Sequence, residues 1–111
     1  MIHAKLDQEL QLLHQRVCPA LGDPKRILIL YALEDGPLCV TEITALLQLP
    51  QPTVSRHLAV LRGRGLVTSE RKGAAVYYHL VDRRLLQAVD LLREVLQAQV
   101  AADVRMAESL A

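Results

Sequence analysis

Residues 40–64 read VTEITALLQLPQPTVSRHLAVLRGR, and this stretch decides the fold. Apolar residues at three- and four-residue steps predict a short helix over 40–48 and a longer one over 51–62. Leu49-Pro50 separates them, because proline stops a continuing helix but suits the first turn of the next one. Two helices joined by so short a link are typical of a helix-turn-helix, which we assign to 40–64. The residues predicted to face the core are Ile43, Leu46, Leu47, Val54, Leu58 and Leu61.

A β-hairpin is predicted directly after this motif, over 66–80. β-Branched and aromatic residues fill 66–69 and 75–80, and the charged segment 70–74 between them contains a glycine. This pattern is typical of two short strands joined by a turn. A hairpin in this position is called a wing, so the sequence predicts a winged helix-turn-helix.

Further helices are predicted on both sides of this unit. One covers 2–17, another begins at the capping pair Asp23-Pro24, and a long last helix over 83–105 is capped by Asp82. The apolar stripe of the first helix is Ile2, Leu6, Leu10, Leu13 and Val17, and that of the last helix is Leu85, Leu86, Val89, Leu92, Leu96 and Val100. We therefore expect a single domain over 1–111, mainly α, with about five helices and a two-stranded wing.

Composition limits the class of protein. With 111 residues the chain is long enough for one core and too short for two, and with 51% hydrophobic residues it buries enough surface to fold. Two cysteines are too few for a disulfide scaffold. No stretch approaches the roughly 18 apolar residues of a membrane span, and the start of the chain lacks the pattern of a secretory signal. We expect a cytoplasmic protein with no membrane partner.

The cations of the chain are concentrated in one segment. Between Gln51 and Gly73 there are five Lys or Arg residues and a single acidic residue, Glu70, although the whole chain carries a net charge of only +1. A solvated charged face is one interpretation, but the coincidence of these cations with the helix-turn-helix and the hairpin favours DNA binding. The predicted contacts are Gln51, Thr53, Ser55, Arg56 and His57 toward the bases, Arg62 and Arg64 toward phosphates, and Arg71 and Lys72 from the wing.

Five segments of the chain resemble the arsenical-resistance repressor (ArsR/SmtB) family. They are LGDPKRILIL at 21–30, LCVTEI at 38–43, QPTVSRHLAVLR at 51–62, GLV at 65–67 and VYYHL at 76–80. The resemblance implies a homodimeric transcriptional repressor whose dimer helices are 2–17 and 83–105. It also implies release from the operator when a metal ion or another stress signal binds. Two recognition helices related by a two-fold axis predict double-stranded DNA with an inverted-repeat operator as the partner.

The residues define less well which signal would release the protein from its operator. Family members that sense arsenite carry a Leu-Cys-Val-Cys pattern, whereas this chain keeps Cys39 but has Thr41 in place of the second cysteine. Members that bind zinc on the last helix use aspartate and histidine there, and no histidine follows Asp82 in this sequence. Arsenite or a soft metal ion, bound through cysteine thiolate, is one candidate effector, and a thiol-reactive signal that oxidises or persulfidates the cysteines is the other. Cys18 is either a second thiol or a small buried hydrophobe, which we favour, and Cys39 is either a sensing thiol or the start of its helix. No metal-ligand set can be assigned.

Two other function classes fit the sequence less well. The sequence contains no glycine-rich phosphate loop and no arrangement of nucleophile and base, so we do not expect an enzyme. A winged-helix module for protein interaction or DNA architecture, without a small effector, is the alternative to a repressor. Basic residues on both the second helix of the motif and the wing favour the repressor.

Overall fold

The computed structural model describes residues 3–111, so Ile2 of the predicted first stripe lies outside the described residues. The predicted mainly α architecture with a β wing is confirmed. The elements are α1 (Ala4–Arg16), a 3-10 turn η1 (Ala20–Gly22), α2 (Pro24–Ala32), β1 (Leu38–Cys39), α3 (Val40–Leu47), α4 (Gln51–Gly63), β2 (Val67–Lys72), β3 (Ala75–Leu80) and α5 (Arg84–Leu110).

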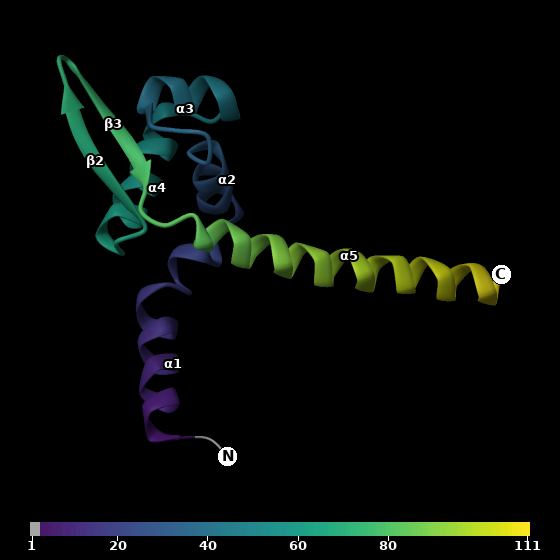
Figure 1. The fold of residues 1–111 in the computed structure, drawn as a ribbon. Helices are drawn as coiled ribbons and strands as arrows, with labels where there is room; N and C mark the ends of the chain where they lie inside the picture. Colours follow the sequence, from purple (N-terminus) through teal and green to yellow (C-terminus); the bar gives the residue numbers. More distant parts are fainter. Residues whose placement is uncertain (1–2) are drawn as a thin grey trace.

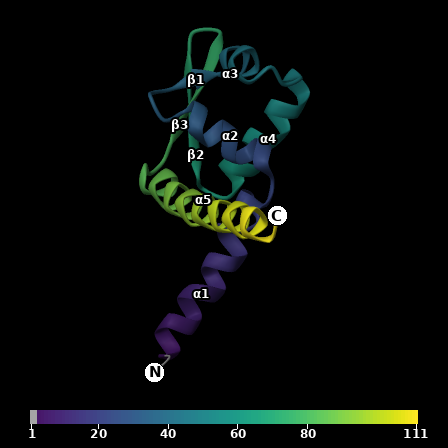
Figure 2. The same cartoon turned by 90° about the vertical axis from the view of Figure 1, so that its right-hand side faces the viewer.

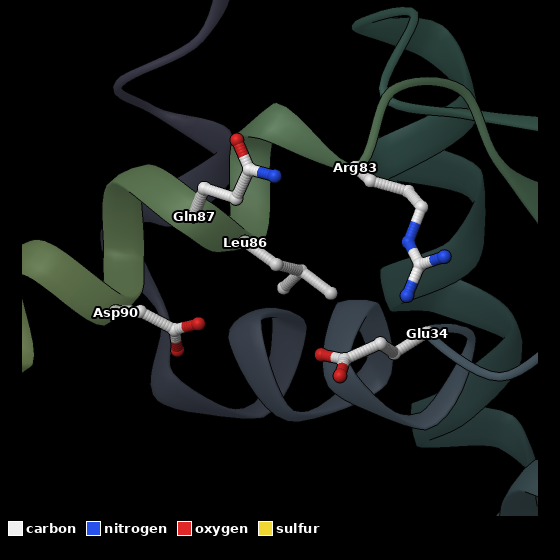
Figure 3. Close-up of a pocket in the computed structure, with 5 residues that line it drawn as sticks. All are labelled: Glu34, Arg83, Leu86, Gln87 and Asp90. Carbon is white, nitrogen blue, oxygen red and sulfur yellow. The ribbon is translucent and has the colours of Figure 1, made fainter.

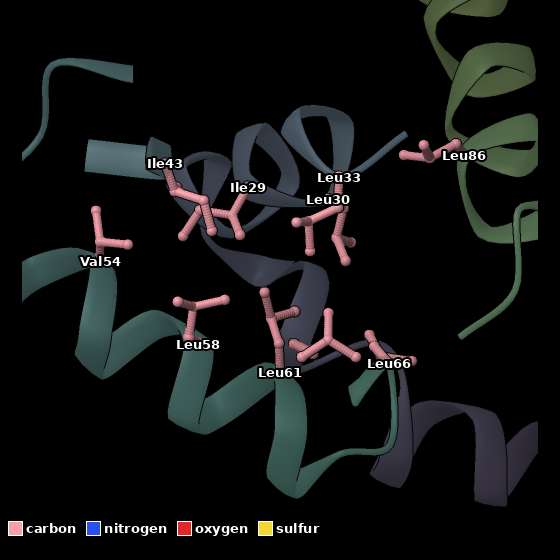
Figure 4. Close-up of a cluster of buried hydrophobic side chains, with 11 residues drawn as sticks. Ile29, Leu30, Leu33, Ile43, Val54, Leu58, Leu61, Leu66 and Leu86 are labelled. Atoms are coloured by element: carbon pink, nitrogen blue, oxygen red, sulfur yellow. The ribbon is translucent and has the colours of Figure 1, made fainter. Parts of the chain in front are cut away.

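An aliphatic core lies between α2, α3 and α4. Figure 4 shows Val54, Leu58 and Leu61 pointing from α4 toward Ile29 and Leu30 of α2. All five side chains are fully buried, as the spacing along α4 predicts. The core therefore fixes which side of α4 faces outward.

The prediction that Leu46 faces the core is wrong. Its side chain is 62% exposed, whereas Ile43 is fully buried and Val40 and Leu47 are partly buried against the core. Val40, Ile43 and Leu47 follow each other at steps of three and four, so they define the packed side of α3, and Leu46 lies at its edge. An eight-residue helix buries only a narrow stripe.

The wing is part of a three-stranded antiparallel sheet with strand order β1-β3-β2. Strand β2 is longer than predicted and includes most of the charged segment, so that the turn is only Gly73-Ala74. Gly73 has a φ of +65°, a conformation that glycine adopts without steric cost at the first position of a two-residue hairpin turn. Strand β1 was not predicted, because its two residues are too few to show an alternating pattern.

Helices α1 and α5 extend away from the body as two arms, with the chain termini at their ends (Figures 1 and 2). The radius of gyration is 17.6 Å, whereas a compact domain of this length has about 13 Å. The accessible surface is 8016 Å², which exceeds the roughly 6,100 Å² of a compact monomer by about 1,900 Å². None of the helices described for residues 3–111 combines the length and apolar character that a membrane crossing needs.

Helix α5 is attached to the body only near its beginning. Asp82 accepts a hydrogen bond from the Arg84 backbone N–H at 2.9 Å, but the N-cap of the helix is Arg83, one residue after the predicted cap. Leu86 and Val89 are buried. Figure 3 shows the start of α5 opposite the end of α2, where Glu34 and Arg83 line a small polar hollow of about 220 Å³. Beyond residue 93 the helix leaves the body as a free arm.

A hydrogen-bonded group joins α5 to α2 one turn further on. The Tyr31 hydroxyl donates to Asp90 Oδ1 at 2.5 Å, and Arg93 lies 3.1 Å from the same oxygen with its guanidinium over the Tyr31 ring. Burial, together with the Asp90 carboxylate, raises the pKa of Tyr31, so the hydroxyl stays protonated and continues to donate. This contact fixes the direction in which α5 leaves the body.

Candidate nucleic-acid interface

The outward side of α4 carries the polar residues that the sequence singled out. Gln51, Ser55, Arg56 and Arg62 are exposed, and Thr53 is partly buried. They face away from the core because Val54, Leu58 and Leu61 occupy the opposite side of the helix. Short hydrogen-bonding groups and one long cation near the first turns suit the edges of bases in a major groove.

The wing supplies a second group of cations. Arg71 and Lys72 are exposed at the end of β2, next to the turn. Figure 1 shows the hairpin running from the body in a direction away from both arms, so its tip is separate from α1 and α5. The tip is free to lie along a DNA backbone.

The exposed cations of this surface have no anionic partner. Among residues 3–111, the ion pairs within 4 Å join His57 to Asp23, His79 to Glu70, Arg84 to Asp82 and Arg93 to Asp90. None of them involves Arg56, Arg62, Arg71 or Lys72. The acidic Glu70 lies 3.5 Å from His79 Nε2, which is itself partly buried and not on a fully exposed face. The surface is therefore poised for a polyanion.

Arg64 differs from the other cations of the segment. It is exposed, but its guanidinium donates a hydrogen bond to the backbone carbonyl of Gln15 at the end of α1. The contact joins α1 to the end of α4. We do not retain Arg64 among the proposed phosphate contacts.

The prediction that His57 contacts DNA is wrong for this structure. Its side chain is 5% exposed and lies on the core side of α4, with Nδ1 3.3 Å from Arg26 and Nε2 3.8 Å from Asp23 Oδ2. The spacing contained a signal for this, since position 57 follows Val54 by three residues and precedes Leu61 by four. The basic segment around it made a DNA contact the expected role. Arg26, which sequence reasoning did not single out, is its partner.

Burial lowers the pKa of His57, and the cations Arg26, Arg56 and Lys25 act in the same direction. The Asp23 carboxylate acts in the opposite direction. The imidazole is therefore neutral at pH 7, and its Nδ1 accepts the hydrogen bond from Arg26. Asp23 is held mainly by the backbone N–H of Lys25, which donates to it at 2.8 Å and lowers its pKa.

The two cysteines occupy separate environments. Cys18 is exposed, so the favoured prediction of a buried hydrophobe is wrong for the single chain. It borders an apolar groove of about 430 Å³, lined by Leu13, Val17, Leu21, Leu66 and Leu85 among others. At this point α1 leaves the body, so it does not cover the apolar side chains that line the groove.

Cys39 is partly buried at the start of α3. Its backbone N–H donates to the Glu42 carboxylate at 3.1 Å, and this hydrogen bond is the main cause of the lowered pKa of Glu42. Cys39 therefore does start its helix. Within residues 3–111, no group of three or more His, Cys, Asp or Glu side chains is arranged to hold a metal ion.

Comparisons with known proteins identify relatives that are transcriptional regulators. Residues 23–69 match the model of a family described as bacterial regulatory protein, arsR family. The uncharacterized HTH-type transcriptional regulator MJ1325 of Methanocaldococcus jannaschii is 40% identical over 77 residues, which cover 68% of this chain and 86% of that protein. The HTH-type transcriptional repressor SmtB of Mycobacterium tuberculosis is 44% identical over 70 residues, which cover 63% of this chain and about half, 52%, of SmtB.

A solved structure shows the same fold. The homodimeric winged helix-turn-helix DNA-binding domain Mb0332 from Mycobacterium bovis, a possible ArsR-family transcriptional regulator, superposes with a TM-score of 0.72 at 25% identity. The match covers 89% of this chain and 91% of that domain. It therefore extends well beyond residues 23–69, the segment that the family model matches.

Proposed function

This chain belongs to the arsR family of bacterial regulatory proteins, and on that premise we propose that it is a homodimeric repressor that binds an inverted-repeat operator. Its relatives are transcriptional regulators, so the chain is a regulator and not an enzyme. The observation that carries the proposal is the outward side of α4 and the wing tip, whose exposed cations lack carboxylate partners in the described part of the chain. Arg56, Thr53, Ser55 and Gln51 are the proposed base readers, and Arg62, Arg71 and Lys72 the phosphate contacts.

The arms support a dimer. On α5 the exposed leucine and valine residues continue past the body, with Leu92 at 65%, Leu96 at 56% and Val100 at 52% exposure. Contiguous apolar surface of this extent marks an interface. If each chain covered its excess of about 1,900 Å², the pair would bury an area within the roughly 2,000–5,000 Å² of obligate homodimers. A second copy of the chain is the proposed partner of α1 and α5.

The first test is a footprint on the DNA upstream of the gene. We expect protection of two inverted half-sites with centres about 34 Å apart, or a multiple of that, because one recognition helix of the dimer enters each. Affinity is expected to fall steeply with salt, since each proposed phosphate contact releases counterions. A footprint of one isolated half-site, or binding that salt does not weaken, would contradict the proposal.

The proposed releasing signal acts on cysteine thiols. Cys18 is exposed and Cys39 partly so, and neither is engaged in a disulfide. Thiolate is the ligand that arsenite and soft metal ions prefer. A site with three ligands requires residues from the second protomer, because no such set exists within the described residues of one chain.

Substitution of the thiols tests this signal. We expect arsenite or peroxide to weaken operator binding by the parent, and the double variant Cys18→Ser/Cys39→Ser to remain bound, as measured by fluorescence anisotropy. The single variants show which thiol acts. The control is the untreated double variant, which is expected to bind like the untreated parent. An equal response of parent and double variant would place the effector elsewhere.

A further inference from the structure

We propose that His57 is a positioning residue, which Arg26 holds against the α1–α2 connection so that α4 presents its outward residues at the angle DNA requires. The inference rests on the proposed DNA binding and adds to it a residue that touches no DNA. His57 is the only polar side chain in the buried set of the described residues. A buried polar group is costly to maintain without a partner, so the hydrogen bond that His57 accepts from Arg26 matters for its burial.

Arg26 joins three segments through one rigid group. Its Nε donates to the carbonyl of Ala20 at 2.7 Å and its Nη2 to the carbonyl of Pro19 at 2.8 Å. Its Nη1 lies 3.3 Å from Nδ1 of His57. The guanidinium is planar, and two of its donors are fixed by the chain that leads out of α1. The third donor therefore holds α4 at a fixed position relative to the base of the α1 arm.

His57 is well placed to transmit this constraint. It follows Ser55 and Arg56 in the same helix turn, and it is buried whereas they are exposed. A rotation or tilt of α4 that breaks the contact with Arg26 moves the side chain of Arg56 in the groove. If the recognition helix shifts by even part of a donor–acceptor distance, every hydrogen bond that its side chains make to the bases becomes weaker.

Protonation of His57 breaks the same contact. The charged and titratable groups around the ring are Asp23, Lys25 and Arg26 from the start of α2, and Arg56 from α4 itself. A proton on Nδ1 removes the acceptor and places a positive charge beside the Arg26 guanidinium. The folded pKa lies below the unfolded value of 6.5, mainly because of burial. Between these two values the unfolded chain binds more protons, so acidification weakens the folded arrangement there.

The experiment compares variants on the footprinted operator over a range of salt concentrations. His57→Leu keeps the bulk and removes the acceptor, and we expect about tenfold weaker binding at every salt concentration. The slope of log affinity against log salt stays unchanged, because no phosphate contact is lost. Arg62→Ala is the matched control for a direct contact, and it is expected to lower that slope by about two for the dimer. His57→Asn places an oxygen acceptor close to the position of Nδ1, and it is expected to bind within about threefold of the parent.

A pH profile separates positioning from general packing. Between about pH 7.5 and pH 5.5 we expect operator affinity of the parent to fall relative to His57→Asn, whose acceptor does not titrate. Arg26→Lys keeps the cation but cannot reach both carbonyls and His57 at once. We expect it to weaken binding as His57→Leu does, and the two changes together to be less than additive. Lys25→Gln, which removes an exposed neighbouring cation, is its control.

Thermal melting establishes that each variant is folded, and native mass spectrometry establishes that it is dimeric. If His57→Leu does not fold, Arg26→Lys and the pH profile carry the test. Parent-like binding by Arg26→Lys, or a parent and His57→Asn with the same pH profile, overturns the inference. A slope lowered by His57→Leu as much as by Arg62→Ala overturns it too, since His57 would then contact DNA directly. If the parent itself binds no DNA, the proposed function fails first.

Discussion

The double substitution Leu92→Glu/Leu96→Glu is expected to convert the protein to monomers and to reduce operator affinity by at least about a thousandfold. Both leucines lie on the apolar side of α5 and are more than half exposed in the single chain. Burial of one leucine contributes about 2 kcal/mol, and four of them lie in a symmetric dimer. Four buried carboxylates would add a desolvation cost.

Loss of the dimer also weakens operator binding, because each monomer contacts only one half-site. Analytical ultracentrifugation gives the oligomeric state and anisotropy gives the affinity. Gln97→Glu adds a negative charge on the polar side of the same helix and is the control, with the parent oligomeric state expected. A double variant that stays dimeric would show that α5 does not form the interface.

Arg56→Ala is expected to weaken binding to the operator by about 100-fold while leaving the fold and the dimer intact. Arg56 is exposed on the first turns of α4, and no carboxylate competes for it within the described residues. A good base contact contributes about 1–3 kcal/mol of discrimination, and the dimer loses one in each half-site. Affinity for unrelated DNA is expected to fall much less, so that the ratio of specific to non-specific binding decreases.

The control removes an equal charge elsewhere. Arg105 is exposed on the α5 arm, far along the chain from α4, and Arg105→Ala is expected to bind within about twofold of the parent. Arg56→Lys retains the charge but not the planar pair of donors, and we expect it to recover non-specific binding only. Equal losses for specific and unrelated DNA in Arg56→Ala would show that Arg56 contacts a phosphate and not a base.

Several elements were predictable because their signals are local. The helix predicted over 40–48 is Val40–Leu47, and the one predicted over 51–62 is Gln51–Gly63. Proline and a three-to-four-residue apolar spacing act within a few residues of each other, so a sequence displays them directly. The strand predicted at 75–80 belongs to the same class.

The errors have one origin, which is contact between segments distant in the chain. Leu46 matches the apolar spacing of α3, but its side chain lies beside the part of the helix that packs on the core and is exposed. Cys18 follows the apolar residue Val17, but its side chain is exposed as well. The partner of Arg64 is a carbonyl at the end of α1, 49 residues away in the sequence. No local pattern encodes such a pairing.

The sequence alone determined the order of the helices and of the two hairpin strands, the apolar side of α4 and the concentration of cations between Gln51 and Gly73, because each depends on neighbours in the chain. Tertiary structure alone decided that Arg26 is the partner of His57, that Tyr31 reaches Asp90 on α5, and that two arms stay uncovered. These outcomes depend on how helices pack after the chain has folded back on itself. The apolar spacing of α4 is compatible with an inward His57, but only the packed neighbours supply the partner that makes its burial favourable.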